Sequence, residues 1–195
     1  KSHGVTREQQ DAFALRSHQR AVAAKMDGSF RNEIVPVMVE TRHNSTVVEN
    51  DEGPREETSL EALGNLTPAF SQGKSVTAGN ASQISDGAAA VILAGKSTVA
   101  RLELDPIARI SGYAHAGVEP ARLFEGPVAA TQALEEKTGF KLADFDLLET
   151  NEAFAAQALA NGVALEYDWN KVNIHGGAVA LGHPLGASGA RILVT

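Results

Sequence analysis

The stretch Asn173–Arg191, NIHGGAVALGHPLGASGAR, holds the densest run of chemically distinctive residues in the chain. Two histidines lie in it among glycines and a proline, ahead of a helix that we expect to begin near Ala187. Glycine lets the backbone approach a ligand closely, and a loop that leads into a helix aims backbone N–H groups toward the helix start. His183 stands between Gly182 and Pro184, in a turn that can fix the direction of its imidazole. This pattern is compatible with a proton-transfer group and, equally, with a histidine that only hydrogen-bonds the backbone.

The other histidine of this loop, His175, is interpreted as structural. We expect no metal site between His175 and His183, because no third ligand lies at a suitable spacing. The chain has 0 cysteines. Within these residues, this excludes a disulfide framework, a thiolate metal site and a thiol nucleophile.

Two further clusters contain candidate functional residues. The segment Asn151–Ala156, NEAFAA, is expected at a junction of strand and helix. Asn151 suits a helix N-cap and Glu152 suits the positive end of a helix, although ligands of open α/β sheets also bind at such junctions. The segment Val76–Ala88, VTAGNASQISDGA, is rich in small residues that let a ligand approach the backbone, but Asp86-Gly87 is equally typical of an ordinary turn.

Composition and charge exclude several classes of function. Hydrophobic residues make up 43% and charged residues 21% of the 195 residues, which is an ordinary globular composition. The 17 basic and 24 acidic side chains leave a net charge of −7, so nucleic acid and anionic membranes are not expected as partners. No apolar run approaches about 20 residues, so we expect no membrane insertion. The amino terminus is not signal-like, and a cytoplasmic location is expected.

The alternation of expected strands and helices, joined by short connections, predicts an α/β fold with helices on the faces of a sheet. Capping boxes are expected for Thr6 with Gln9 and for Thr58 with Glu61. Ala88–Ala94 is typical of a strand buried on both faces. Helices are expected over residues 6–26, 60–63, 97–104, 127–137 and 152–165 and from 187 onward. Extended segments are expected over residues 34–40, 46–49, 88–94, 106–114, 145–149 and 172–174.

Three motifs in a fixed order resemble the motif series of the thiolase family: TAGNASQISD (77–86), NEAF (151–154) and GHPLGASG (182–189). The resemblance implies a layered fold of two similar α/β halves with an inserted loop domain. Residues 1–85 would form most of the loop, or cap, domain, and residues 86–195 most of the C-terminal half. The first half with its nucleophilic cysteine, and the last strands with a second cysteine, would lie outside this chain. The absence of an initiator Met at Lys1 and the apolar end at Thr195 agree with a piece of a longer chain.

The family resemblance also implies a reaction, namely Claisen condensation or thiolytic cleavage of a 3-ketoacyl-coenzyme A of the acetoacetyl type. His183 matches the histidine that activates the nucleophilic cysteine, and Asn151 matches the asparagine that holds an oxyanion-stabilising water. Acyl-coenzyme A and coenzyme A are the implied partners, without a further cofactor. The full-length protein would be a homodimer or homotetramer, and this chain alone would be inactive.

The resemblance places six further residues along the coenzyme A moiety. Arg55 matches a residue near the adenosine phosphate, although a solvated loop charge is an alternative. For Phe70 and Phe154, core packing is an alternative to ligand contact. The matching residues along the pantetheine arm are Ser82, Ala78 and Ile84. Ser188 and Gly189 are assigned to the turn and helix start.

Two other functions remain open at this point. A non-catalytic member of the superfamily, which handles lipids or acts as a scaffold, agrees with the absence of a thiol. A ketoacyl synthase that acts on carrier-protein substrates fits less well, because such enzymes usually place a second histidine where this chain has Asn151.

Overall fold

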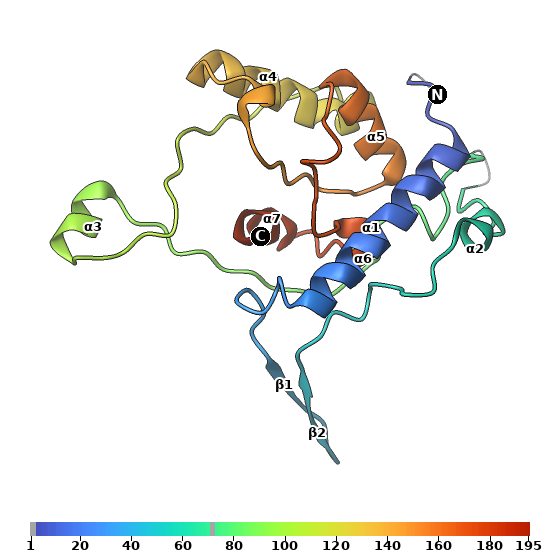
Figure 1. Ribbon diagram of the computed structural model, residues 1–195, viewed down its shortest axis with the longest axis horizontal. Coiled ribbons are helices and arrows are strands. Elements are labelled where there is room, and N and C mark those ends of the chain that lie inside the picture. Colours follow the sequence, from blue (N-terminus) through green and yellow to red (C-terminus); the bar gives the residue numbers. More distant parts are fainter. Residues whose placement is uncertain (1–2, 71–72) are drawn as a thin grey trace. The chain divides into compact units, whose positions relative to one another are not determined.

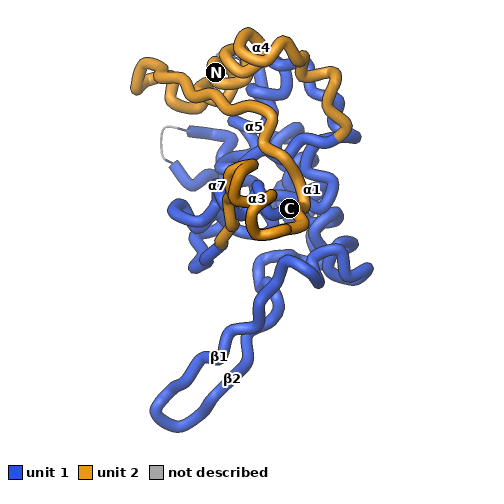
Figure 2. Tube along the Cα trace, turned by 90° about the vertical axis from the view of Figure 1, so that its left-hand side faces the viewer, with its two compact units in different colours: residues 1–89, 147–195 blue, residues 90–146 orange. Residues whose placement is uncertain are grey.

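The computed structural model describes residues 3–70 and 73–195. It divides into two compact units, one of residues 1–89 with 147–195 and one of residues 90–146 (Figure 2). The first unit contains α1 (Arg7–Asp27), β1 (Val37–Glu40), β2 (Ser45–Val48), α2 (Leu60–Gly64), α5 (Ala155–Ala164), α6 (Ala178–Leu181) and α7 (Ser188–Val194). The second contains α3 (Lys96–Arg101), the 3-10 helix η1 (Pro120–Glu125), α4 (Gly126–Thr138) and the 3-10 helix η2 (Leu142–Asp144).

Helix α1 is the longest element, and its ends follow from local sequence. The Thr6 side chain accepts a hydrogen bond from the backbone of Gln9, and the Gln9 side chain accepts one from the backbone of Thr6, which confirms the expected capping box. Gly28 ends the helix with φ of 78°, a conformation that glycine adopts at low cost.

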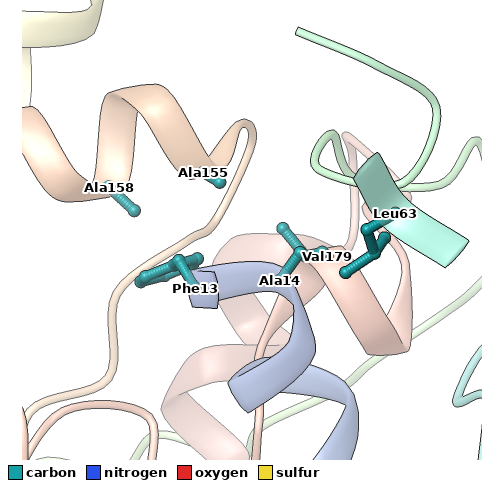
Figure 3. Packing of buried hydrophobic residues seen from close by; sticks show 6 residues of the cluster. All are labelled: Phe13, Ala14, Leu63, Ala155, Ala158 and Val179. Carbon is teal, nitrogen blue, oxygen red and sulfur yellow. The ribbon is translucent and has the colours of Figure 1, made fainter. Parts of the chain in front are cut away.

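The core of the first unit forms where α1 packs against α2, α5 and α6 (Figure 1). Its centre is a cluster of buried apolar side chains, drawn in Figure 3: Phe13, Ala14, Leu63, Ala155, Ala158 and Val179. Phe13 meets the Trp169 ring edge-on, with 5.6 Å between the ring centroids. Burying a side chain of this size contributes about 2–3 kcal/mol. Helices from both ends of the sequence are therefore joined in one core.

The hairpin β1–β2 confirms the two extended segments expected in the first third of the chain. Val37 pairs with Val48 and Glu40 with Ser45 in antiparallel register. Thr41 and Asn44 close the turn through backbone and side-chain hydrogen bonds. Pro36, which lacks a ladder donor, lies just outside β1.

In the second unit, α4 begins at Gly126 with Pro127 in its first turn. It ends at Gly139, which has φ of 77°. Both ends confirm the expected helix over residues 127–137 to within a residue. Helix α3 overlaps the helix expected over residues 97–104, starting one residue earlier and ending three residues sooner.

Several expected strands do not form. Residues 88–94 and 106–114 adopt no strand, and Ile92 and Ile107 are almost fully exposed. Of the segments 145–149 and 172–174, only a parallel bridge between Leu148 and Val172 forms. The reason is physical: a strand needs a neighbouring strand for its backbone hydrogen bonds. Within residues 3–70 and 73–195, the segments 88–94 and 106–114 meet no such partner.

Two helix starts also differ from expectation. The N-cap of α2 is Ser59 rather than Thr58, and its hydroxyl accepts from the backbone N–H of Ala62. Helix α5 begins at Ala155 rather than at 152, because Asn151 and Glu152 make the tertiary contacts described below. In the described part of the chain, none of the helices combines the length and apolar character needed to cross a membrane.

Candidate active site around Asn151 and His183

Asn151 and His183 lie side by side, although 32 residues separate them in the sequence. The Nδ2 atom of Asn151 is 3.1 Å from Nε2 of His183. Asn151 follows the bridge at Leu148 and precedes α5, and His183 follows α6. Both side chains are half-buried. The structure thus brings together the two residues predicted to be catalytic.

Ser188 determines which nitrogen of the imidazole carries the proton. Its Oγ atom lies 2.6 Å from Nδ1 of His183 and donates to the carbonyl oxygen of Pro184 at 3.0 Å. Because the single hydroxyl proton of Ser188 is used on Pro184, Oγ accepts from Nδ1–H of His183. The Nε2 atom then carries the one free lone pair of the ring, which accepts from the Asn151 amide in this structure. That lone pair can take a proton from a thiol that displaces the amide.

The assignment of Ser188 to the helix start was correct but incomplete. The side chain is 5% exposed and begins α7, as expected. Its contact with His183 was missed in the sequence. A serine five residues after a histidine, one at each end of a turn that leads into a helix, is a signal that could have suggested it.

The carboxyl group of Glu152 lies beneath the site and is only 2% exposed. It accepts hydrogen bonds from Ser17 Oγ at 2.7 Å, Asn173 Nδ2 at 2.8 Å and the backbone N–H of Val179 at 3.2 Å. Burial raises the pKa of this carboxyl, and the hydrogen bonds oppose that rise. Glu152 thus joins the loop before α5 to Ser17 of α1, Asn173 and Val179 of α6.

The segment that carries Ala78 and Ser82 is held by a second buried polar side chain, Asn80. Its Oδ1 accepts from the backbone N–H of Thr77, and its Nδ2 donates to Asp11 Oδ1 at 2.8 Å. The Asn80 carbonyl accepts from the backbone N–H at the start of α5. The N–H of Ser82 donates to the carbonyl of Ala153. These bonds hold the segment against the residues that follow Asn151.

An open cavity of about 620 Å³ lies beside this segment in the first unit. Arg55 and Ala78, both predicted to contact coenzyme A, are among its lining residues. The others are His18, Glu56, Glu57, Thr58, Ala62, Leu63, Leu66, Gly79, Gln83 and Val179. His18 Nδ1 accepts from the backbone N–H of Arg55 at 3.1 Å. Burial, together with the charge of Arg55, lowers the pKa of His18 and keeps its ring neutral for this contact.

The remaining predicted residues, Ser82, Ile84, Phe70 and Phe154, do not line this cavity. Ile84 is fully exposed and Phe70 is 56% exposed. Ser82 and Phe154 are half-buried, and Phe154 forms an antiparallel bridge with Ala81. Phe70 therefore does not pack in the core.

His175, the other histidine of the glycine-rich loop, packs on an aromatic ring. Its ring meets Phe30 edge-on, with 5.8 Å between the ring centroids. This packing agrees with its interpretation as structural. Within residues 3–70 and 73–195, no three histidine, aspartate or glutamate side chains are grouped to hold a metal ion.

Comparison with known proteins places this geometry in a family. The family model of the thiolase N-terminal domain matches residues 1–97, and that of the thiolase C-terminal domain matches residues 104–195. An acetyl-CoA acetyltransferase of Escherichia coli (strain K12) is 54% identical over 195 residues, covering 100% of this chain and 50% of the relative. One from Pseudomonas aeruginosa is 53% identical, covering 99% and 49%. The chain spans about half the length of these curated relatives.

Solved structures of similar proteins also match this chain over almost its whole length. A Bacillus anthracis acetyl-CoA acetyltransferase superposes with a TM-score of 0.97 at 46% identity, covering 99% of this chain and 49% of that one. The human mitochondrial 3-ketoacyl-CoA thiolase gives a TM-score of 0.91 at 41% identity, with the same coverage. These matches confirm the predicted thiolase-like α/β fold, although the expected strands at 88–94 and 106–114 do not form here. With its motif series, its fold and its paired asparagine and histidine, the chain belongs to the thiolase family.

Proposed function

We propose that this chain forms part of a longer acyltransferase that moves acyl groups between coenzyme A thioesters through a cysteine acyl-enzyme. The observation that carries the proposal is the contact between Asn151 and His183, in which Nε2 of the imidazole keeps its lone pair. A base with a fixed direction beside an amide donor is what activation of a thiol requires. The names of the similar proteins, acetyl-CoA acetyltransferase and 3-ketoacyl-CoA thiolase, favour acyl transfer over the non-catalytic alternative.

In the proposed reaction, Nε2 of His183 takes the proton of a cysteine thiol supplied from outside this chain. The thiolate attacks the thioester carbonyl, and coenzyme A leaves as its thiol. The oxygen of the tetrahedral intermediate becomes negatively charged and needs hydrogen-bond donors. Asn151 contributes through a water: its Oδ1 is buried and accepts no hydrogen bond from the described residues, so a position for a water donor is open. A second cysteine outside this chain would move the substrate α-proton.

The proposed position of the substrate follows the cavity lined by Arg55 and Ala78. The coenzyme A moiety would lie along it, with Arg55 at the phosphate end and Ala78 along the pantetheine arm. Ser82, which does not line the cavity, would contact the pantetheine arm from beside it. A guanidinium forms paired hydrogen bonds with phosphate, which suits the place of Arg55. Ile84, Phe70 and Phe154 would contact the ligand from the rim.

Four further proposals accompany this function. The cap domain ends at residue 85 and the C-terminal half begins at residue 86. The full-length protein is a homodimer or homotetramer. It acts in the cytoplasm. It needs no cofactor besides coenzyme A as substrate or product.

Substitution of the imidazole tests the function. In the full-length protein, His183→Ala should slow acylation by acetyl-coenzyme A about 10²–10⁴-fold, as loss of a general base does. His175→Ala is the matched control, because its ring packs on Phe30 and leaves Asn151 untouched. A slowing of less than threefold by His183→Ala would remove this residue from the mechanism. The 195-residue chain alone should cleave no acetoacetyl-coenzyme A above buffer.

A further inference from the structure

The segment that follows Ser82 packs closely on the turn that carries His183. The backbone N–H of His183 donates to the carbonyl of Gln83 at 3.1 Å. A Cβ atom on Gly182 would lie 2.1 Å from Ser85 Oγ, and one on Gly87 would lie 2.7 Å from Pro184 Cγ. Because there is no space between the two segments, a shift of Gln83 displaces the turn as well.

The side chain of Gln83 reaches in the other direction, to the loop that carries Arg55. Its Nε2 donates to the carbonyl of Gly53 at 3.0 Å and to the carbonyl of Ala180 in α6 at 3.3 Å. An amide nitrogen has two protons, so both are used. The loop lies directly against α6 there, because a Cβ on Gly53 would be 2.3 Å from the Ala180 oxygen.

Gln83 therefore contacts two separate loops. Through its backbone it meets the turn that carries His183, and through its side chain it meets a carbonyl two residues before Arg55. His18 also holds the Arg55 backbone. Gln83, His18 and Arg55 all line the cavity, whereas His183 does not. The loop is thus held by polar side chains rather than by an apolar core.

We propose that Gln83 is a positioning residue for substrate specificity. It holds the Arg55 loop at a fixed position relative to the His183 turn. As a result, the site prefers thiols that carry the complete coenzyme A nucleotide to shorter pantetheine thiols. This inference rests on the proposed function for the identity of the ligand. The backbone bond of Gln83 to His183 does not depend on its side chain, so replacing the side chain affects the part of the ligand that the Arg55 loop touches.

The test measures dissociation constants of coenzyme A and of pantetheine, by calorimetry on the full-length protein. Gln83→Met keeps the length of the side chain but removes both donors, and should weaken coenzyme A binding about tenfold, as expected for two lost hydrogen bonds. Pantetheine binding should change less than twofold. Gly53→Ala displaces the same loop by a different route and should give the same selective loss. Gln19→Met, on the exposed face of α1, is the matched control.

The outcomes separate the inference from the proposed function. A selective loss for coenzyme A in both variants supports the inference, whether or not the protein turns over thioesters. An equal loss for both ligands, or no loss for coenzyme A, overturns it, since Gln83 would then have only a structural role or none. Circular dichroism and thermal unfolding show whether Gln83→Met or Gly53→Ala fails to fold. In that case the binding constants of the other variant decide between these outcomes. Failure of acyl transfer in the unmodified protein contradicts the proposed function alone.

Discussion

The hydrogen bond between Ser188 and His183 leads to the sharpest prediction. Ser188→Ala removes the acceptor of the Nδ1–H group and leaves that group without a partner in a half-buried position. An unpaired donor of this kind costs about 1–3 kcal/mol. The imidazole can avoid that cost by moving its proton to Nε2, where it blocks the lone pair that takes the thiol proton. Each 1.4 kcal/mol corresponds to about a tenfold change in rate, so acylation should slow about 10- to 100-fold.

Two measurements check this prediction. Single-turnover release of coenzyme A from acetyl-coenzyme A gives the acylation rate of the full-length protein. Nitrogen-15 NMR of labelled histidine locates the proton, which should lie on Nδ1 of His183 before the substitution and shift toward Nε2 after it. Ser85→Ala is the matched control, because Ser85 lies beside the same turn but bonds only the Gln83 carbonyl. A proton on Nε2 in the unmodified protein, or a rate within twofold after Ser188→Ala, would refute the reasoning.

Two further predictions concern the buried carboxyl groups. Burial raises the pKa of Glu149 to about 7; the folded chain therefore holds a proton that the unfolded chain has lost, and stability falls as pH rises from about 4.5 through 7. Glu149→Gln should abolish that decline, on the order of 2–3 kcal/mol, in urea titrations at pH 5 and pH 8. Gly177→Ala would put a Cβ 2.3 Å from the carboxyl carbon of Glu152 and should cost about 2–5 kcal/mol of unfolding free energy. Gly186→Ala, which meets open space, should change it little; equal effects would contradict the account of Glu152.

Local sequence was sufficient for the helices with strong end signals. The reciprocal bonds of Thr6 and Gln9 and the left-handed glycines at 28 and 139 depend only on neighbouring residues. They are therefore visible in the sequence and present in the structure. The hairpin at residues 37–48 is equally local, because its two strands pair with each other across a short turn.

The predicted strands failed where pairing is not local. Residues 88–94 have the apolar composition of a buried strand, yet Ile92 and Leu93 are exposed at 98% and 69%. An apolar composition indicates that a segment would be buried if a neighbouring strand were present. It does not show whether that strand is present. The matched relatives are about twice as long as this chain.

For the candidate site, three motifs in a fixed order were enough to predict its members from the sequence by itself. They indicated which imidazole, which amide and which small-residue segment belong together. The tertiary structure alone decided the geometry. It set the 3.1 Å contact of Asn151 with His183 and the proton position fixed by Ser188. It also buried Glu152, which the sequence had only shown to suit the positive end of a helix. Proton positions and burial depend on atoms brought from 32 to 135 residues away, and no local pattern encodes distances across that separation.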